Sequence, residues 1–209
     1  MASIAQAHEP RFPRQPGTGY PLDDNRGTWG MWLTIATEAT LFVLLFSSYF
    51  FLENNKDRWH IDEPPKMHLA FIMLAILIAS SFVLHWGEKQ LKLERYLRAR
   101  LALGVTILMG LGFLAVSAAE YLDHWKELTP YSDSYGSIFY TIVSFHAAHV
   151  IVGLLILSYT LVMPRYSPAL RSPYRPYHVA SLYWHFVDTV WIFIVGLLYV
   201  MPNVRVYGF

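Results

Sequence analysis

One apolar stretch, Trp29 to Leu52, is long enough to cross a membrane as a single α-helix, because a spanning helix needs about 20 mostly apolar residues. This stretch contains one ionisable side chain, Glu38. A carboxylate inside the bilayer costs about 2.5–3.5 kcal/mol on insertion scales, so such a residue usually has a partner or carries a proton. The sequence therefore predicts a membrane helix whose carboxyl group contacts another part of the chain.

The composition of the whole chain indicates a membrane protein. Of its 209 residues, 55% are hydrophobic, and the net charge of +1 gives no electrostatic reason to expect nucleic acid as a partner. The absence of cysteine excludes disulfides, iron–sulfur clusters and thiolate metal sites. Residues 1–28 are polar and proline-rich and lack the apolar core of a signal peptide, so we interpret them as an irregular arm.

Four further apolar stretches follow the first, and no internal repeat or second domain is visible. The segment 87–98 is strongly charged and is predicted to be a helical extension into water, and Pro202 is predicted to end the last span. The predicted fold class is all-α, with residues 29–209 forming one transmembrane bundle of five helices. The expected spans are 29–52, 67–86, 99–119, 137–163 and 178–201.

The loop charges predict the orientation. Most of the 16 lysines and arginines fall in the N-terminal arm, the second loop and the fourth loop. Because basic loops stay on the cytoplasmic side, we expect the N-terminus inside and the C-terminus outside.

Polar residues recur inside the other spans. His146 and His149 are three residues apart, as are His185 and Asp188, so each pair shares a helix face. Three histidines and two carboxylates could hold a metal or bracket a haem. The same side chains are also explained as buried groups that hydrogen-bond between helices, or as groups that handle protons. His185 and Asp188 could form a charge-assisted pair without help from another helix.

Three segments together resemble subunit III of the haem-copper terminal oxidases: WGMWLTIATEATLF, FHAAHVIVG and WHFVDTVWIF. The pair Glu120-Tyr121 at the end of the third span fits the same family. The resemblance covers about Trp29 to Met201 and corresponds to the five-span bacterial form of this subunit. It identifies as motif residues Glu38, His146, His149, Glu120, Tyr121, Trp184, His185, Phe186, Asp188 and Trp191.

This resemblance implies a noncatalytic core subunit of a proton-pumping oxidase in the bacterial plasma membrane. Such a subunit binds no haem or copper itself. It packs on subunit I, which holds the haems and copper that reduce oxygen, and subunit II and other oxidase subunits complete the complex. It also binds phospholipid in a cleft and supports turnover and proton uptake in subunit I. The missing first two helices of the long form leave one wall of that cleft to be supplied by another subunit.

The electron donor implied is cytochrome c, with a quinol oxidase as the alternative. Two other classes compete with the resemblance: a small haem-binding electron carrier that uses the span histidines, and a proton-coupled transporter that uses Glu38. The absence of an internal repeat and of proline-broken spans disfavours the transporter.

Two specific contacts are expected. Glu38 lies about nine residues into an outward span and His149 about twelve residues into an inward one, or ~14 Å and ~18 Å from opposite sides. In a core ~30 Å thick these depths nearly coincide, which predicts a Glu38–His149 pair. The alternative is a protonated Glu38 that hydrogen-bonds to the backbone or to Thr34. His185 and Asp188 are expected to serve packing and assembly.

Overall fold

The structure, a computed structural model, describes residues 26–54, 67–124, 134–162 and 174–207. These residues are almost entirely helical. Five helices are long and apolar enough to cross a membrane, which confirms the predicted all-α class with five spans. The elements are α1 (Arg26–Asn54), α2 (Met67–Lys92), α3 (Tyr96–His124), α4 (Ser134–Val162), α5 (Tyr174–Ile194), the π-helix η2 (Val195–Val200) and α6 (Met201–Tyr207).

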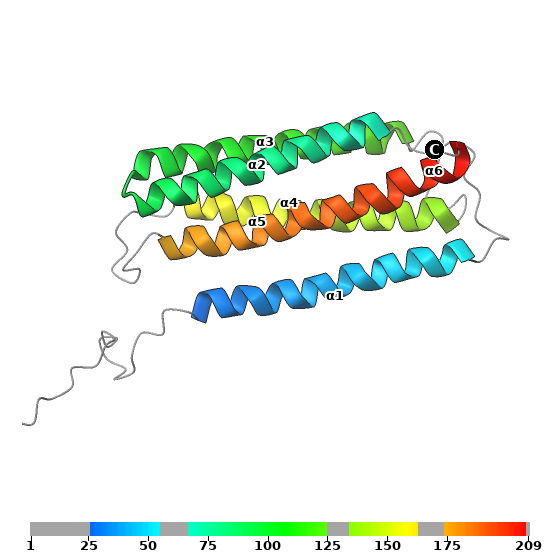
Figure 1. Cartoon of the computed structure of the whole chain (residues 1–209), viewed down its shortest axis with the longest axis horizontal. Helices are drawn as coiled ribbons and strands as arrows, with labels where there is room; N and C mark the ends of the chain where they lie inside the picture. The colour runs from blue at the N-terminus through cyan, green and yellow to red at the C-terminus, as the bar shows by residue number, and fades with distance from the viewer. Residues whose placement is uncertain (1–25, 55–66, 125–133, 163–173, 208–209) are drawn as a thin grey trace, which may run out of the picture.

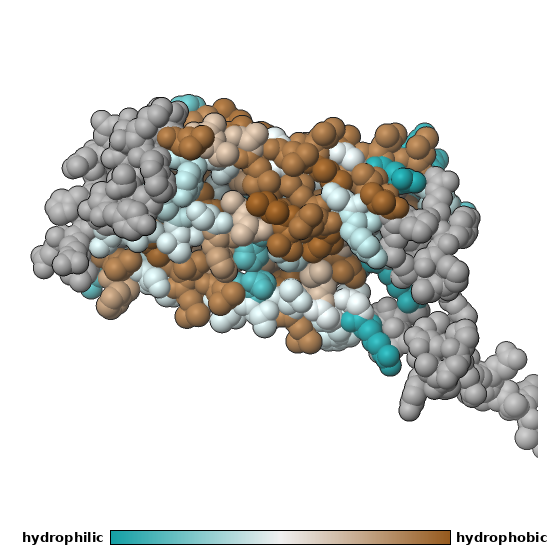
Figure 2. All heavy atoms as spheres, turned by 180° about the vertical axis from the view of Figure 1, so that it is seen from behind, coloured by the Kyte–Doolittle hydropathy of each residue, from teal (hydrophilic) through white to brown (hydrophobic). Residues whose placement is uncertain are grey.

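The helices are arranged in three layers (Figure 1). Helices α2 and α3 lie together, α4 and α5 form the middle layer, and α1 contacts α4 and α5 from the other side. Helix α5 is the most buried of the five spans and α1 the least. On the face of the bundle that Figure 2 shows, apolar side chains dominate between the two ends, as expected of a surface that faces lipid.

One end of the bundle carries several basic side chains. The α2–α3 connection carries lysines and arginines and lies at the same end as the start of α5 (Figure 1). We call this the basic end. The sequence rule for loop charges predicts that it faces the cytoplasm. The bounds of the helices differ from the expected spans by a few residues at most ends, since helical structure continues beyond the apolar core.

The charged segment 87–98 is helical at both ends, as predicted, since α2 continues to Lys92 and α3 begins at Tyr96. A turn between them interrupts the predicted helical extension. Helix α2 ends at Lys92, and the amides of Glu94 and Arg95 donate to the carbonyls of Leu91 and Gln90 at 3.0 and 2.9 Å. Glu94 has a φ of 58°, the left-handed conformation that closes this type of helix end. The sequence offers no glycine at that position, so the turn was not recognisable from its usual signal.

Pro202 does not end the last span, contrary to the prediction. It lies in the first turn of α6, where a backbone N–H is not needed for the helix. In a continuous α-helix the N–H of residue 202 would donate to the carbonyl of Leu198, and proline has no such donor. The hydroxyl of Tyr135 donates to this carbonyl, at 3.2 Å. The π-helix η2 immediately precedes this site, so the chain changes its helical winding around the proline without stopping.

The core around Trp184 depends on close helix approach. Trp184 is fully buried, and its indole lies against Gly110 of α3 and Gly153 of α4. A Cβ atom added to Gly110 would lie 2.7 Å from Trp184 and 2.8 Å from Leu154. Small residues thus let α3 and α4 approach the largest side chain of α5.

Several expectations fall on residues outside the described ranges. These are most of the N-terminal arm (1–25), most of the first, third and fourth loops (within 55–66, 125–133 and 163–173) and the last expected residue of the fourth span, Met163. Residues 26–28, which were expected to belong to the arm, are the first residues of α1.

Candidate functional site

Glu38 and His149 are in contact across α1 and α4. Nε2 of His149 lies 3.0 Å from Oε2 of Glu38, well inside the ~6 Å range of strong charge coupling. The structure therefore confirms the contact predicted from depth. Nδ1 of the same ring lies 2.8 Å from the carbonyl oxygen of Phe145, one turn earlier on α4.

The hydrogen bonds of His149 determine how many protons the pair holds. A carbonyl oxygen only accepts, so Nδ1 of His149 carries a hydrogen. A hydrogen bond between Nε2 and Oε2 then needs one more proton, which sits either on the ring or on the carboxyl group. In both forms the pair is neutral overall, which makes it compatible with a membrane interior.

The threonines near Glu38 are not its partners. The hydroxyl of Thr34 donates to the carbonyl of Gly30 at 3.0 Å, and that of Thr37 donates to the carbonyl of Thr34 at 2.8 Å. The alternative in which Thr34 satisfies Glu38 is therefore not what the structure shows.

The pair lies in a groove between α1 and α4. The groove has a volume of about 490 Å³, and its other lining residues are mainly apolar. Glu38 keeps 30% of its side-chain surface exposed, and His149 keeps 10%. The groove thus gives the paired carboxyl group limited access from the surface of the bundle.

His146 takes a different role from His149. It is buried, and its ring stacks on Trp191 with centroids 4.9 Å apart. Phe113 and Phe42 contact it edge-on. Neither ring nitrogen has a hydrogen-bond partner among the described residues. The two histidines, although three residues apart, therefore serve different contacts: His149 joins α1, and His146 is part of an aromatic cluster.

His185 and Asp188 do not form the direct pair that the sequence suggested. The hydroxyl of Ser81 on α2 lies between them, 2.7 Å from Nδ1 of His185, and it also donates to Oδ2 of Asp188. The pair therefore does need help from another helix, because both side chains point toward α2 and its serine oxygen occupies the space between them. Their expected role in assembly stays a prediction.

The remaining motif residues of α5 are packing residues. The indole N–H of Trp184 donates to Oγ of Ser80 at 2.9 Å. Phe186 lies edge-on to Phe42 of α1 at 6.3 Å, and Trp191 lies edge-on to Phe113 of α3 at 4.9 Å. One helix thus contacts three others through its aromatic side chains.

Glu120 and Tyr121 lie near the other end of the bundle. Glu120 is buried and accepts a hydrogen bond from the hydroxyl of Tyr199 at 3.3 Å. Tyr121 lies edge-on to Tyr140, with ring centroids 4.8 Å apart. This motif therefore joins α3 to the π-helix and to α4.

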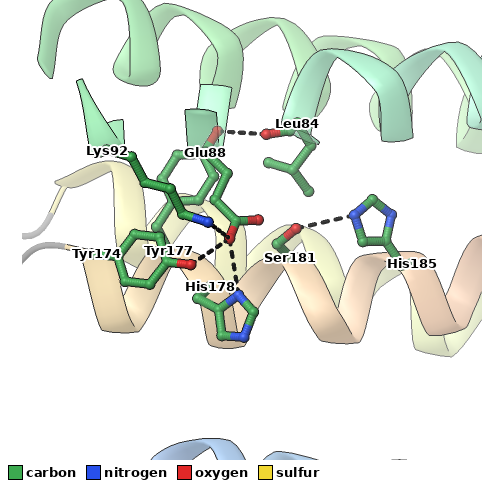
Figure 3. Close-up of polar contacts among 8 residues, drawn as sticks. All are labelled: Leu84, Glu88, Lys92, Tyr174, Tyr177, His178, Ser181 and His185. Atoms are coloured by element: carbon green, nitrogen blue, oxygen red, sulfur yellow. Dashed lines mark hydrogen bonds and ion pairs between the residues drawn. The ribbon is translucent and has the colours of Figure 1, made fainter. Parts of the chain in front are cut away.

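A polar cluster at the basic end was missed by the sequence reasoning (Figure 3). Oε1 of Glu88 accepts hydrogen bonds from Tyr174 at 2.8 Å and from Nδ1 of His178 at 3.0 Å, and Lys92 Nζ lies 3.9 Å away. Glu88 is buried although it lies in a charged segment of the sequence. The spacing of Glu88 and Lys92, four residues apart, was a visible signal for one part of this cluster.

The polar side chains of the spans do not converge on a metal site. Among the described residues, no group of three or more His, Asp or Glu side chains has the geometry of a metal site. Glu38, His149, Asp188 and His185 each make hydrogen bonds with protein groups instead.

Five apolar helices joined by pairs of intramembrane polar and aromatic side chains define a polytopic membrane protein of the helical-bundle class. The family described as cytochrome c oxidase subunit III matches residues 24–202. The chain belongs to the cytochrome c oxidase subunit III family.

The relatives of the chain agree with this assignment. It is 35% identical over 201 residues to cytochrome c oxidase subunit 3 of Bacillus subtilis, covering 92% of this chain and 94% of that protein. The same shares hold for cytochrome c oxidase subunit 3 of Bacillus sp. strain PS3, at 32% identity over 196 residues. Quinol oxidase subunit 3 of Bacillus subtilis is 28% identical over 174 residues, covering 82% of this chain and 85% of that protein.

Family membership also fixes the setting of the chain. It is an integral protein of the bacterial plasma membrane and, as a member of a family of oxidase subunits, it is part of a multi-subunit respiratory complex.

Proposed function

We propose that this chain is the noncatalytic subunit III of a proton-pumping haem-copper oxidase, packs directly on subunit I and holds no redox centre of its own. The observation that supports this most is the use of the motif residues. Glu38, His149 and Trp184 lie in segments that carry the family resemblance, and each makes a contact between helices of this chain. They serve the bundle, and the oxygen chemistry belongs to the partner subunits.

The proposed partners include subunit II and phospholipid as well as subunit I. Two grooves suit lipid tails: the one between α1 and α4, and a second of about 560 Å³ between α3 and α4, lined mostly by apolar residues. In the membrane, such grooves on the outer surface are in reach of acyl chains, which gain by burying apolar surface there.

Cytochrome c is the proposed electron donor. From the same organism, Bacillus subtilis, the relative named as a cytochrome c oxidase subunit is more similar to this chain than the relative named as a quinol oxidase subunit, at 35% against 28% identity.

Removing the chain from the oxidase tests this proposal. A strain without the chain should yield an oxidase that keeps the haem absorption spectrum and the initial rate of oxygen reduction. That oxidase should lose activity faster during continuous turnover, and re-expression of the chain should restore the lifetime. Loss of one haem per missing chain would contradict the proposal, as would an unchanged lifetime.

A further inference from the structure

A line of polar side chains runs along α5 where this helix faces α2. Its members are spaced by four, three, four and three residues, so they share one helix face. They are Tyr174, His178, Ser181, His185 and Asp188. Such a polar line within an otherwise apolar span is expensive in a membrane and indicates a function beyond packing.

The deeper part of this line is a continuous chain of hydrogen bonds. Oγ of Ser181 lies 3.1 Å from Nε2 of His185, and Nδ1 of the same ring lies 2.7 Å from Oγ of Ser81. Ser81 in turn donates to Oδ2 of Asp188. We call these four residues the α2–α5 seam. Figure 3 shows its first link, between Ser181 and His185.

The directions of these hydrogen bonds follow from the chemistry of the groups. A hydroxyl carries one hydrogen, so Ser81, which donates to Asp188, must accept from Nδ1 of His185. With Nδ1 protonated and the ring neutral, Nε2 accepts from the hydroxyl of Ser181. Every hydrogen in the seam therefore points toward Asp188.

One carboxyl oxygen of Asp188 accepts no hydrogen bond from the described residues. Its side chain is buried, and Oδ1 has no hydrogen-bond partner among the described residues. An ionised carboxylate that receives only one hydrogen bond in an apolar interior is costly. Binding a proton removes that cost.

The basic end of the bundle offers a source of protons. The cluster of Glu88, Tyr174 and His178 lies there, with Lys92 exposed to solvent beside it. Ser181 lies three residues beyond His178 on α5, or ~4.5 Å along the helix axis. A single water molecule spans such a separation.

Other ionisable groups around α5 lie outside this chain of hydrogen bonds. His85 and Glu88 on α2 and His178 on α5 are close enough to His185 to interact electrostatically. On the other faces of α5, His146 of α4 stacks on Trp191, and Glu38 of α1 shares a groove with Tyr183.

We infer that the α2–α5 seam is a proton-storage site in which Asp188 takes up a proton that enters at Ser181. The entering proton binds Oγ of Ser181 while the serine's own hydrogen moves to Nε2 of His185. The hydrogen on Nδ1 moves to Ser81, and the Ser81 hydrogen moves to Oδ2 of Asp188.

One proton has then entered, the carboxylate has become a neutral acid, and His185 has changed tautomer without gaining net charge. Release reverses each step. This site goes beyond the proposed function and does not depend on it.

Infrared spectroscopy of the intact complex tests the inference. The carbonyl band of a protonated carboxyl group shifts when its hydrogen is replaced by deuterium, so the rate of the shift reports how fast Asp188 exchanges its proton. Asp188→Asn should remove this band, and Asp188→Glu should move it. Ser81→Ala should slow the exchange by at least ~10-fold, because a positioned proton-transfer group contributes typically 10²–10⁴-fold.

Ser80→Ala is the matched control. Ser80 precedes Ser81 on α2 and binds Trp184, yet its hydroxyl is not part of the seam. The exchange rate in Ser80→Ala should equal that of the unchanged complex. Equal rates in Ser80→Ala and Ser81→Ala would overturn the inference. So would the absence, at every pH at which the complex is stable, of a carboxylic band that responds to Asp188→Asn or Asp188→Glu.

Discussion

Glu38 and His149 hold one shared proton at the contact between α1 and the rest of the bundle. Because Nδ1 of His149 is committed to the carbonyl of Phe145, the ring cannot turn away from Glu38 without losing a second hydrogen bond. Helix α1 buries less of its surface than any other span, so a polar contact of this kind has a large influence on its attachment.

A double-mutant cycle measures this contact. Glu38→Ala and His149→Ala should each lower the free energy of unfolding in detergent, because each leaves its partner without a hydrogen bond. The double variant should lose less free energy of unfolding than the two single variants together, with a coupling energy of about 1–3 kcal/mol. Thr37→Ala is the control, since the Thr37 hydroxyl is exposed and donates to the carbonyl of Thr34 in its own helix. Additive losses from Glu38→Ala and His149→Ala would show that the two side chains do not interact.

The sequence could predict the Glu38–His149 contact because Glu38 has no ionisable neighbour in its own span. Helix geometry then gives the depth of both residues. The sequence could not predict how His185 and Asp188 are joined. Serine is common in membrane helices, so Ser81 does not stand out in the sequence. Only the packing of α2 against α5 brings its hydroxyl between the two side chains. Serine carries no signal of its own until the neighbouring helix is known.

At the scale of the helix, the approach of α3 and α4 to Trp184 depends on the absence of a side chain at Gly110 and Gly153. Gly110 has Trp184 and Leu154 within 3 Å of the position that a Cβ would take, and both of these side chains are buried. Gly112, two residues later on the same helix, has nothing within 4 Å of that position.

Alanine substitutions at Gly110 and Gly112 should therefore change the free energy of unfolding in opposite directions. Gly110→Ala should destabilise the bundle by about 1–3 kcal/mol, because a methyl group is forced into a filled core. Gly112→Ala should stabilise it by up to ~1 kcal/mol, since alanine favours the helix more than glycine does. Unfolding of both variants in the same detergent provides the comparison, and a Gly110→Ala variant as stable as Gly112→Ala would be inconsistent with this packing.

The π-helix and the proline after it show where helix prediction from sequence fails. Proline usually ends a helix, and Pro202 was expected to end the fifth span. The carbonyl of Leu198, which an N–H at position 202 would bond in a continuous α-helix, accepts a hydrogen bond from the hydroxyl of Tyr135, 63 residues away in the chain. No local pattern could reveal a partner so distant.

Removing this one hydroxyl tests that explanation. Tyr135→Phe removes a buried hydrogen bond to the Leu198 carbonyl, which should cost about 0.5–1.5 kcal/mol of stability. Tyr159→Phe is the control, because Tyr159 is exposed on α4. The two variants should differ in their unfolding free energy, and equal values would mean that the hydroxyl of Tyr135 does not support the end of this span.

At the scale of the whole molecule, the number of spans and the all-α class followed from composition and length alone, because a membrane permits few other solutions. The arrangement of the helices in layers could not be predicted in this way, because it depends on which faces of the helices pack together. In the described part of the chain, Glu38, His149 and Asp188 each make a hydrogen bond to another helix of the same bundle.

The most direct test of the central claim is to purify a tagged copy of this chain from its native membrane and record the haem spectrum and metal content of what comes with it. The tagged chain should co-purify with the oxidase subunits and with their haems and copper. The chain purified alone, folded and helical, should contain neither. Stoichiometric haem or copper in the folded isolated chain would contradict the assignment as a noncatalytic oxidase subunit, as would recovery from native membranes without any oxidase subunit.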